Sequence, residues 1–222
     1  MFIDIARLLQ AHNNPPNYLL TWLNHPMSLT DKLRDFSGDA ELEVLKQYWT
    51  SPNWWDKQVL GIAEKSVFHR DILMFSHQIP CWYARSIIPE QTYKANDHFF
   101  NRLTHESLGS IVFSESNVAR VQLVNYPITP QCIEYYWLPN FLKREEKEIS
   151  DSQFFNVPRL GGMQESATLT QSRGQAGGKD KERCNLLQKE QLWTRLSLFT
   201  AKEGLNFYLI EILLPGLLGI MK

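Results

Sequence analysis

Hydrophobic residues run with few interruptions through several short segments of this chain, and turn-forming or polar residues bound each segment. Apolar runs of this kind are typical of β-strands that are buried in a sheet. The pattern predicts strands from residue 41 to about 49 and at residues 66–76, 81–88, 119–124, 192–200 and 205–214. Short turns follow the second and the fifth of these strands, which favours an antiparallel sheet.

Helical spacing of hydrophobic residues is concentrated in the first part of the chain. It predicts a helix over residues 2–12, two short helices within 17–36 that Asn24-His25-Pro26 separates, and a further helix over 90–105. Either Ser28 or Thr30 is a suitable N-cap for the second short helix. Because the helices do not alternate regularly with the strands, the fold class that follows is α+β.

Residues 127–190 differ in character from the rest of the chain. They begin with an apolar stretch, continue through a charged run at 143–148 and end in a glycine-containing polar sequence at 172–179. A structureless connection of this length is uncommon inside a compact domain. We therefore expect a single domain over residues 1–222, in which 127–190 is an inserted and partly flexible segment before the last two strands.

The composition is that of an ordinary globular protein, with 222 residues, 43% hydrophobic and 21% charged, and a formal net charge of -1. This balance argues against a nonspecific nucleic-acid surface. The three cysteines are widely spaced and form no metal-binding pair, which favours a reducing, cytoplasmic setting. The N-terminus lacks the features of a signal peptide. The apolar C-terminal run is too short for a membrane span, which takes about 20 residues.

Two charged residues interrupt apolar runs, and they provide most of the candidate chemistry. Arg70 lies within Val67–Phe75, and Glu211 lies within Phe207–Pro215. A charge in a core segment is costly unless a partner compensates it. The two residues therefore suggest an enclosed pocket for a small ligand with an anionic group and a hydrogen-bonding group. An arginine can hold a carboxylate through two parallel hydrogen bonds.

Both residues also have a structural interpretation. Arg70 could face solvent on an edge strand, and Glu211 could lie on a solvated face of the sheet. Arg85 interrupts its strand in the same manner and is either a second ligand for an anion or a structural ion-pair partner, of which we expect the second. The same two interpretations apply to Arg195. The chain has no phosphate-binding glycine loop, no G-x-S-x-G elbow and no H-E-x-x-H motif.

Six stretches of the chain follow one another as they do in a known family: Ser28–Leu33 after Trp22-Leu23, then Phe68–Leu73, Trp82–Pro89, Ser107–Phe113, Leu192–Ser197 and Phe207–Pro215. In this order they resemble the chorismate pyruvate-lyases, the ubiquinone-biosynthesis enzymes that convert chorismate to 4-hydroxybenzoate and pyruvate. Each stretch alone is weak evidence for the family. Six stretches in the same order and at comparable spacing, apart from one gap, are a fairly specific signal. The resemblance covers roughly residues 18–126 and 191–216.

The resemblance implies a six-stranded antiparallel sheet flanked by helices, with an internal site that helical flaps close. It assigns ligand contacts to Leu29, Arg70, Leu108 and Glu211. Arg70 would bind a carboxylate of the substrate and product, and Leu108 would add backbone hydrogen bonds. Glu211 would hold the ring hydroxyl, and Leu29 would form part of an apolar wall. Arg70 and Glu211 would be the catalytic residues.

The resemblance also implies that no metal or cofactor takes part, because aromatisation drives the loss of pyruvate. The partners would be the substrate chorismate and the product 4-hydroxybenzoate, without nucleic acid and without an integral membrane segment. The protein would be a cytoplasmic monomer. Leu29 stands where a methionine is common in the family, and Ser107 stands where a proline is common. Residues 127–190 replace a connection that is usually short.

Two other readings stay open at this point. One is a noncatalytic sensor that binds an aromatic acid, like the ligand-binding domains of some bacterial transcription regulators of this fold. Those proteins also carry a DNA-binding domain, and the first 40 residues here are too few and not basic enough for one. The other is a degenerate relative that binds aromatic acids and acts through its inserted segment.

Overall fold

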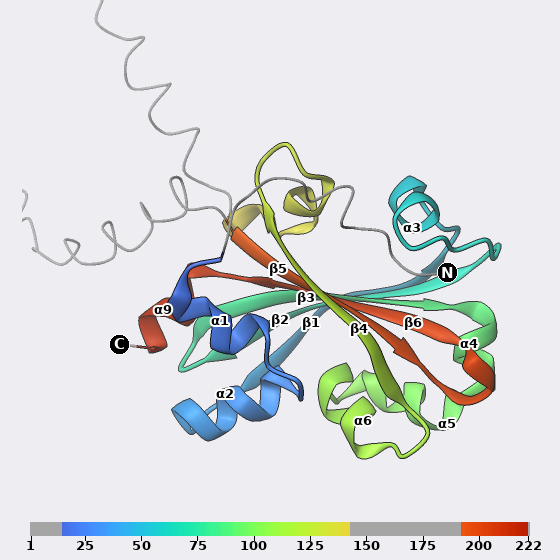
Figure 1. The fold of residues 1–222 in the computed structure, drawn as a ribbon, viewed down its shortest axis with the longest axis horizontal. Coiled ribbons are helices and arrows are strands. Elements are labelled where there is room, and N and C mark those ends of the chain that lie inside the picture. The colour runs from blue at the N-terminus through green and yellow to red at the C-terminus, as the bar shows by residue number, and fades with distance from the viewer. Residues whose placement is uncertain (1–14, 143–191, 222) are drawn as a thin grey trace, which may run out of the picture. The chain divides into compact units, whose positions relative to one another are not determined.

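The predicted α+β fold class and antiparallel sheet are confirmed. A computed structural model describes residues 15–142 and 192–221. Within these residues, six strands form one antiparallel sheet in the order β1-β2-β3-β6-β5-β4 (Figure 1). The strands are β1 (Glu41–Thr50), β2 (Val67–Ser76), β3 (Ile79–Pro89), β4 (Ala119–Ile128), β5 (Leu192–Thr200) and β6 (Asn206–Leu213). The last strand, β6, lies in the middle of the sheet, because it pairs with both β3 and β5.

Most of the helices cover one face of this sheet. They are α1 (Asn17–Leu23), α2 (Leu29–Ser37), α3 (Trp54–Gln58), α4 (Glu90–Ala95), α5 (Asp97–Phe100), α6 (Leu108–Ser114) and α9 (Pro215–Ile220). In Figure 1, α1, α2 and α6 lie on one side of the sheet and α3 lies on the other. The two predicted short helices are therefore confirmed as α1 and α2. Ser28 is the N-cap of α2, since its hydroxyl accepts a hydrogen bond from the Asp31 N–H at 3.2 Å.

The single helix expected over residues 90–105 is wrong, because the segment forms α4, α5 and a 3₁₀ turn, η2 (Asn101–Thr104). Asn96 ends α4 with a non-helical φ of -132°. Its side-chain amide donates to the Thr92 carbonyl at 2.9 Å. Asparagine can replace a backbone partner in this way, which lets the chain change direction at that point.

The turn between β2 and β3 is shorter than the sequence suggested. The turn expected over residues 76–80 shrinks to His77 and Gln78, which take φ values of 49° and 63°. Two successive residues at positive φ are typical of a tight hairpin whose twist matches that of the strands. Pro80, expected in the turn, is a residue of β3. After β6 the chain forms α9, and Pro215 begins this helix, where a fixed φ suits the first helical turn.

The sheet has two distinct faces because successive side chains of a strand point to opposite sides. Phe68, Arg70 and Ile72 of β2 project from one face, which we call the helical face. Phe68 and Ile72 belong there to the main hydrophobic core, together with residues from α1, α2 and α6. Asp71, between them, projects from the other face. This division decides which charged residues can meet.

The chain divides into two compact units, residues 1–132 with 191–222, and residues 133–190. The first two residues of the predicted insertion, 127 and 128, belong to β4. In the second unit the structure describes two 3₁₀ turns, η3 (Ile133–Trp137) and η4 (Asn140–Leu142). The helix predicted over 2–12 and the segment 143–190 lie outside the described residues. No helix in the described ranges is long and apolar enough to cross a membrane.

Candidate functional site

Arg70 is a buried arginine without a carboxylate partner among the described residues. Its side chain is 1% exposed, and β2 lies between β1 and β3, so the interpretation of a solvent-facing edge arginine is wrong. One guanidinium nitrogen, Nη2, donates to the Glu106 carbonyl at 3.0 Å, whereas Nε has no hydrogen-bond partner in the described part of the chain. Burial lowers the pKa of Arg70 to about 10. A buried guanidinium in this state is a strong attractor for an anion.

The helix α6 begins beside this guanidinium. Glu106, whose carbonyl binds Arg70, lies just before Leu108, the first residue of α6. The first N–H groups of a helix have no acceptor within it. The Ser107 hydroxyl accepts only from the N–H of Ser110, at 3.1 Å. The N–H groups of Leu108 and its successor therefore remain donors for a ligand that Arg70 holds.

The start of α2 packs against the start of α6. A Cβ atom added to Gly109 would lie 3.3 Å from the Ser28 hydroxyl oxygen, so glycine allows the two helices to approach. Leu29, the first residue of α2, and Leu108 are both buried in the main core. Three of the four predicted contact residues, Leu29, Arg70 and Leu108, thus belong to one neighbourhood.

Glu211 projects from the helical face as well, so the interpretation that its face is solvated is wrong; the side chain is 5% exposed. Arg70 is paired in the sheet with Ser86 of β3, and Glu211 is paired with Ala84 of the same strand. The two charged residues are therefore separated by β3 and are offset by two residues along it, which places their Cα atoms about 12 Å apart. Ala84 and Ser86, the residues of β3 between them, have small side chains.

Arg195 is the partner of Glu211, and we had not assigned it to the site from the sequence. The two residues are directly opposite in the β5–β6 register, and Arg195 Nε lies 2.8 Å from Glu211 Oε2. Neither atom has a well-directed hydrogen bond in the described residues, so the contact is electrostatic. The ion pair compensates the buried carboxylate, while its geometry leaves the carboxylate able to accept a hydrogen bond from a ligand.

Arg195 also ties the sheet to the connection between α1 and α2. Its Nη1 donates to the Trp22 carbonyl at 2.9 Å, and its Nη2 donates to the His25 carbonyl at 3.2 Å. The side chain is 0% exposed. The helical segment in front of the site is thus held by the same arginine that compensates Glu211. A signal existed in the sequence, since Arg195 interrupts an apolar run much as Glu211 does.

The opposite face of the sheet carries a separate ion pair, and this confirms the structural expectation for Arg85. Its Nε and Nη2 donate to the two carboxylate oxygens of Asp71 at 2.7 and 2.8 Å. Burial alone would raise the pKa of Asp71, but the hydrogen bonds and charge of Arg85, with Lys46 nearby, hold it below its ordinary value. His69 lies on this face too, with its Nε2 3.2 Å from an oxygen of Asp56. Neither pair belongs to the helical face.

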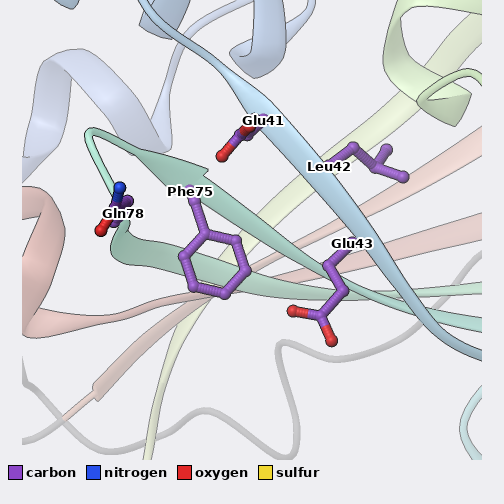
Figure 2. Close-up of a pocket in the computed structure, with 5 residues that line it drawn as sticks. All are labelled: Glu41, Leu42, Glu43, Phe75 and Gln78. Atoms are coloured by element: carbon purple, nitrogen blue, oxygen red, sulfur yellow. The ribbon is translucent and has the colours of Figure 1, made fainter.

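A surface hollow of ≈ 340 Å³ lies away from these residues. It is lined by Glu41, Leu42, Glu43, Phe75 and Gln78, at the end of the β2–β3 hairpin (Figure 2). None of the predicted site residues contributes to it, and its charged groups are carboxylates. The helical face, with its buried arginine, is therefore more favourable for binding an anionic ligand. In the described part of the chain, no three histidine, cysteine or acidic side chains come together to hold a metal ion.

Comparison with known families identifies one family whose model matches a large part of the chain. The family model described as chorismate lyase matches residues 9–135, which is more than half of the chain. The chain belongs to the chorismate lyase family. The matched range includes Leu29, Arg70 and Leu108. It ends before β5 and β6, so Glu211 and Arg195 lie outside it.

Curated relatives are similar over part of their length. A probable chorismate pyruvate-lyase of Pseudoalteromonas translucida is 28% identical over 102 residues, 46% of this chain and 56% of that protein. A protein of the same name from Coxiella burnetii is 28% identical over 120 residues, 53% of this chain and 65% of that protein. The chain therefore spans only about half to two thirds of the length of these relatives.

Among solved structures, the effector domain of PhnF from Mycobacterium smegmatis aligns with a TM-score of 0.45 and 12% identity, over 84% of this chain and 87% of that chain. A GntR-family transcriptional regulator from Bacillus cereus aligns with a TM-score of 0.44 and 14% identity, over 79% and 92%. Likenesses this distant decide nothing about function.

Proposed function

We propose that this member of the chorismate lyase family eliminates pyruvate from chorismate and releases 4-hydroxybenzoate. The observation that carries the proposal is the buried Arg70 guanidinium, which has no carboxylate partner among the described residues and shares a face of the sheet with Glu211. A carboxylate on the ligand would supply the missing partner. A ring hydroxyl on the same ligand would reach the buried carboxylate of Glu211.

Each predicted residue has a role in this proposal. Arg70 and the backbone N–H of Leu108 would bind the ring carboxylate of chorismate and of its product. Glu211, compensated by Arg195 at 2.8 Å, would accept a hydrogen bond from the ring hydroxyl. Leu29, buried at the start of α2, would form an apolar wall against the ring.

The reaction suits a site of this kind. The bond between a ring carbon and the enolpyruvyl oxygen breaks, and the neighbouring ring carbon, which carries the hydroxyl, loses its proton. The ring becomes aromatic, so the elimination is strongly downhill and involves no net oxidation. Groups that hold the two ends of the ring in a fixed, water-excluded geometry can then supply much of the rate enhancement.

Further parts of the proposal follow from this reaction. The product would enter ubiquinone biosynthesis, the protein would act in the cytoplasm without a metal or cofactor, and it would do so as a monomer. Slow release of 4-hydroxybenzoate is expected, because the site lies between the sheet and the starts of α2 and α6, which would have to move apart.

The decisive experiment is to incubate the purified protein with chorismate and to measure 4-hydroxybenzoate and pyruvate together. Equimolar formation above the spontaneous background is expected. Glu211→Ala should abolish turnover, whereas Glu43→Ala, an exposed glutamate on β1, should leave it unchanged. Arg70→Gln should chiefly weaken binding.

Two other outcomes would overturn the assignment in different ways. Tight binding of 4-hydroxybenzoate without turnover would indicate a sensor domain or a decayed enzyme. Neither turnover nor binding would mean that only the fold has been retained.

A further inference from the structure

Two arginines from neighbouring strands converge on one backbone carbonyl. Arg195 Nη2 and Arg120 Nη1 donate to the His25 oxygen at 3.2 and 3.3 Å. Arg120 Nη1 also donates to the Pro26 carbonyl at 2.6 Å. Guanidinium groups this close repel each other unless an anion lies between them. Glu211 neutralises one of them, Arg195, so the charge of Arg120 is not compensated by a carboxylate in the described residues.

Like Arg70, Arg120 has no carboxylate within ion-pair distance in the described ranges. Its Nε is buried and has no hydrogen-bond partner there. The guanidinium lies over the rings of Phe113 and Phe199, 4.9 and 5.1 Å from their centres. Burial first, and then the charge of Arg195, lower the pKa of Arg120 to about 10, although Glu211 partly offsets this. The surroundings therefore favour an additional negative charge.

Two more basic side chains, Lys32 and His25, respond to the positive charge of Arg195. Lys32 on α2 has its pKa lowered by burial and by the charge of Arg195. His25 has its pKa lowered by burial, by Lys32 and by both arginines. The charge of Arg195 thus disfavours the charged forms of both Arg120 and Lys32, while Glu211 contacts Arg195 itself. A ligand that places an anion here would relieve this repulsion.

We propose that Arg120 and Arg195 form a second carboxylate subsite, which binds the carboxylate of the enolpyruvyl group of chorismate. This inference rests on the proposed function. Chorismate carries two carboxylates, and two arginines of the described residues, the buried Arg70 and the partly buried Arg120, have no carboxylate partner there. The enolpyruvyl group is attached to the ring carbon next to the hydroxyl-bearing carbon. Its carboxylate must therefore lie near the end of the site where Glu211 receives the hydroxyl.

The subsite also suits the electron flow of the elimination. As the carbon–oxygen bond breaks, its electron pair moves to the departing oxygen, giving enolpyruvate, while the ring loses a proton and becomes aromatic. Enolpyruvate then gains a proton at its methylene carbon to become pyruvate. Fixed positive groups beside the departing fragment stabilise the charge that develops there. After release of pyruvate, the bound 4-hydroxybenzoate has no carboxylate at this end.

The test compares two ligands that differ in this carboxylate. In Arg120→Met, kcat/KM for chorismate should fall about 10- to 100-fold, the loss of one charged hydrogen bond. The dissociation constant for 4-hydroxybenzoate should change by less than about twofold, because that ligand never contacts the subsite. Arg70→Met should weaken both ligands. Arg34→Met, at an exposed arginine on α2, should affect neither.

Arg120→Lys provides a second variant in case the methionine variant is unstable. Lysine keeps the charge and a donor for the His25 carbonyl but loses the planar fork, so we expect an intermediate fall for chorismate and none for 4-hydroxybenzoate. Equal weakening of both ligands would show that Arg120 only holds the α1–α2 connection, and unchanged chorismate kinetics would remove it from the site. If the wild-type protein neither turned over chorismate nor bound 4-hydroxybenzoate, the proposed function would fail and the subsite with it.

Discussion

Replacing Arg70 by methionine should stabilise the unliganded protein while removing its affinity for 4-hydroxybenzoate. Arginine ordinarily keeps its charge to pH values above 12, yet burial lowers the pKa of Arg70 to about 10. Linkage converts this difference into a penalty of about 3 kcal/mol on the charged form in the folded state. Both the ordinary and the lowered pKa lie above 7, so the penalty is fully present at pH 7.

The net gain in stability is smaller than the penalty. Methionine preserves much of the side-chain volume and removes the charge, but the hydrogen bond from Arg70 Nη2 to the Glu106 carbonyl is lost. That loss offsets about 1 kcal/mol. We therefore expect the free energy of unfolding of Arg70→Met to exceed that of the wild type by about 1–2 kcal/mol.

Urea unfolding at pH 7, followed by tryptophan fluorescence with and without 4-hydroxybenzoate, measures both effects. At a ligand concentration of 100 times Kd, the wild type should gain about 2.7 kcal/mol, and the variant should gain nothing. The reasoning would be refuted if Arg70→Met lost more than about 1 kcal/mol without ligand, or if 4-hydroxybenzoate stabilised it as much as the wild type.

Arg85→Met is the matched control, because it removes the same group from the adjacent strand. Arg85 makes two short hydrogen bonds to the buried carboxylate of Asp71. Its removal leaves that buried carboxylate with the half-exposed Lys46, 3.3 Å away, as its ion-pair partner, and should cost about 3 kcal/mol. Opposite signs for the two variants would show that pairing decides the effect. If both variants changed the free energy of unfolding in the same direction, the volume and packing of the side chain would matter more than its charge.

Three further predictions concern stability and the space above β3. The pKa of Asp71 is lowered in the folded state. Its contribution to the free energy of unfolding is therefore fully present above the ordinary aspartate pKa of about 4 and is lost as the pH falls through the lowered value. Asp71→Asn should weaken the acid dependence of urea unfolding. Gly216→Ala would bring a Cβ atom within 2.2 Å of the Pro80 carbonyl and should cost about 2 kcal/mol or more by thermal unfolding. Ser86→Leu fills the space beside Arg70 and should reduce the affinity for 4-hydroxybenzoate in calorimetry by roughly tenfold or more; unchanged affinity would place the ligand elsewhere.

Local patterns in the sequence determined the elements of the sheet. The apolar runs and their polar turns predicted the strands around Arg70 and Glu211 to within a few residues, because strands buried on both faces read as nearly continuous hydrophobic segments. Pattern reasoning failed where a side chain replaced a backbone partner. Asn96 broke the helix expected over residues 90–105 by bonding to the Thr92 carbonyl.

The sequence also marked Arg70 and Glu211 as unusual, because each interrupts an apolar run. It did not reveal which of the interrupting charges were paired. Arg85 and Arg70 lie in similar surroundings in the sequence, yet Arg85 meets Asp71 across the β2–β3 register, while Arg70 meets Ser86. A shift of one residue in this register would place Arg70 opposite Arg85 or Ile87 and would separate Arg85 from Asp71.

Only the tertiary structure decided the composition of the site. Arg195 binds the Trp22 carbonyl, 173 residues away in sequence, and Arg120 binds the carbonyl of Pro26 from a strand 94 residues later. No local pattern predicts such contacts, because they depend on the order β1-β2-β3-β6-β5-β4. The sequence alone thus specified which segments become strands and which charges are costly to bury. The sheet order and register determined which of those charges found a partner and which were left to bind a ligand.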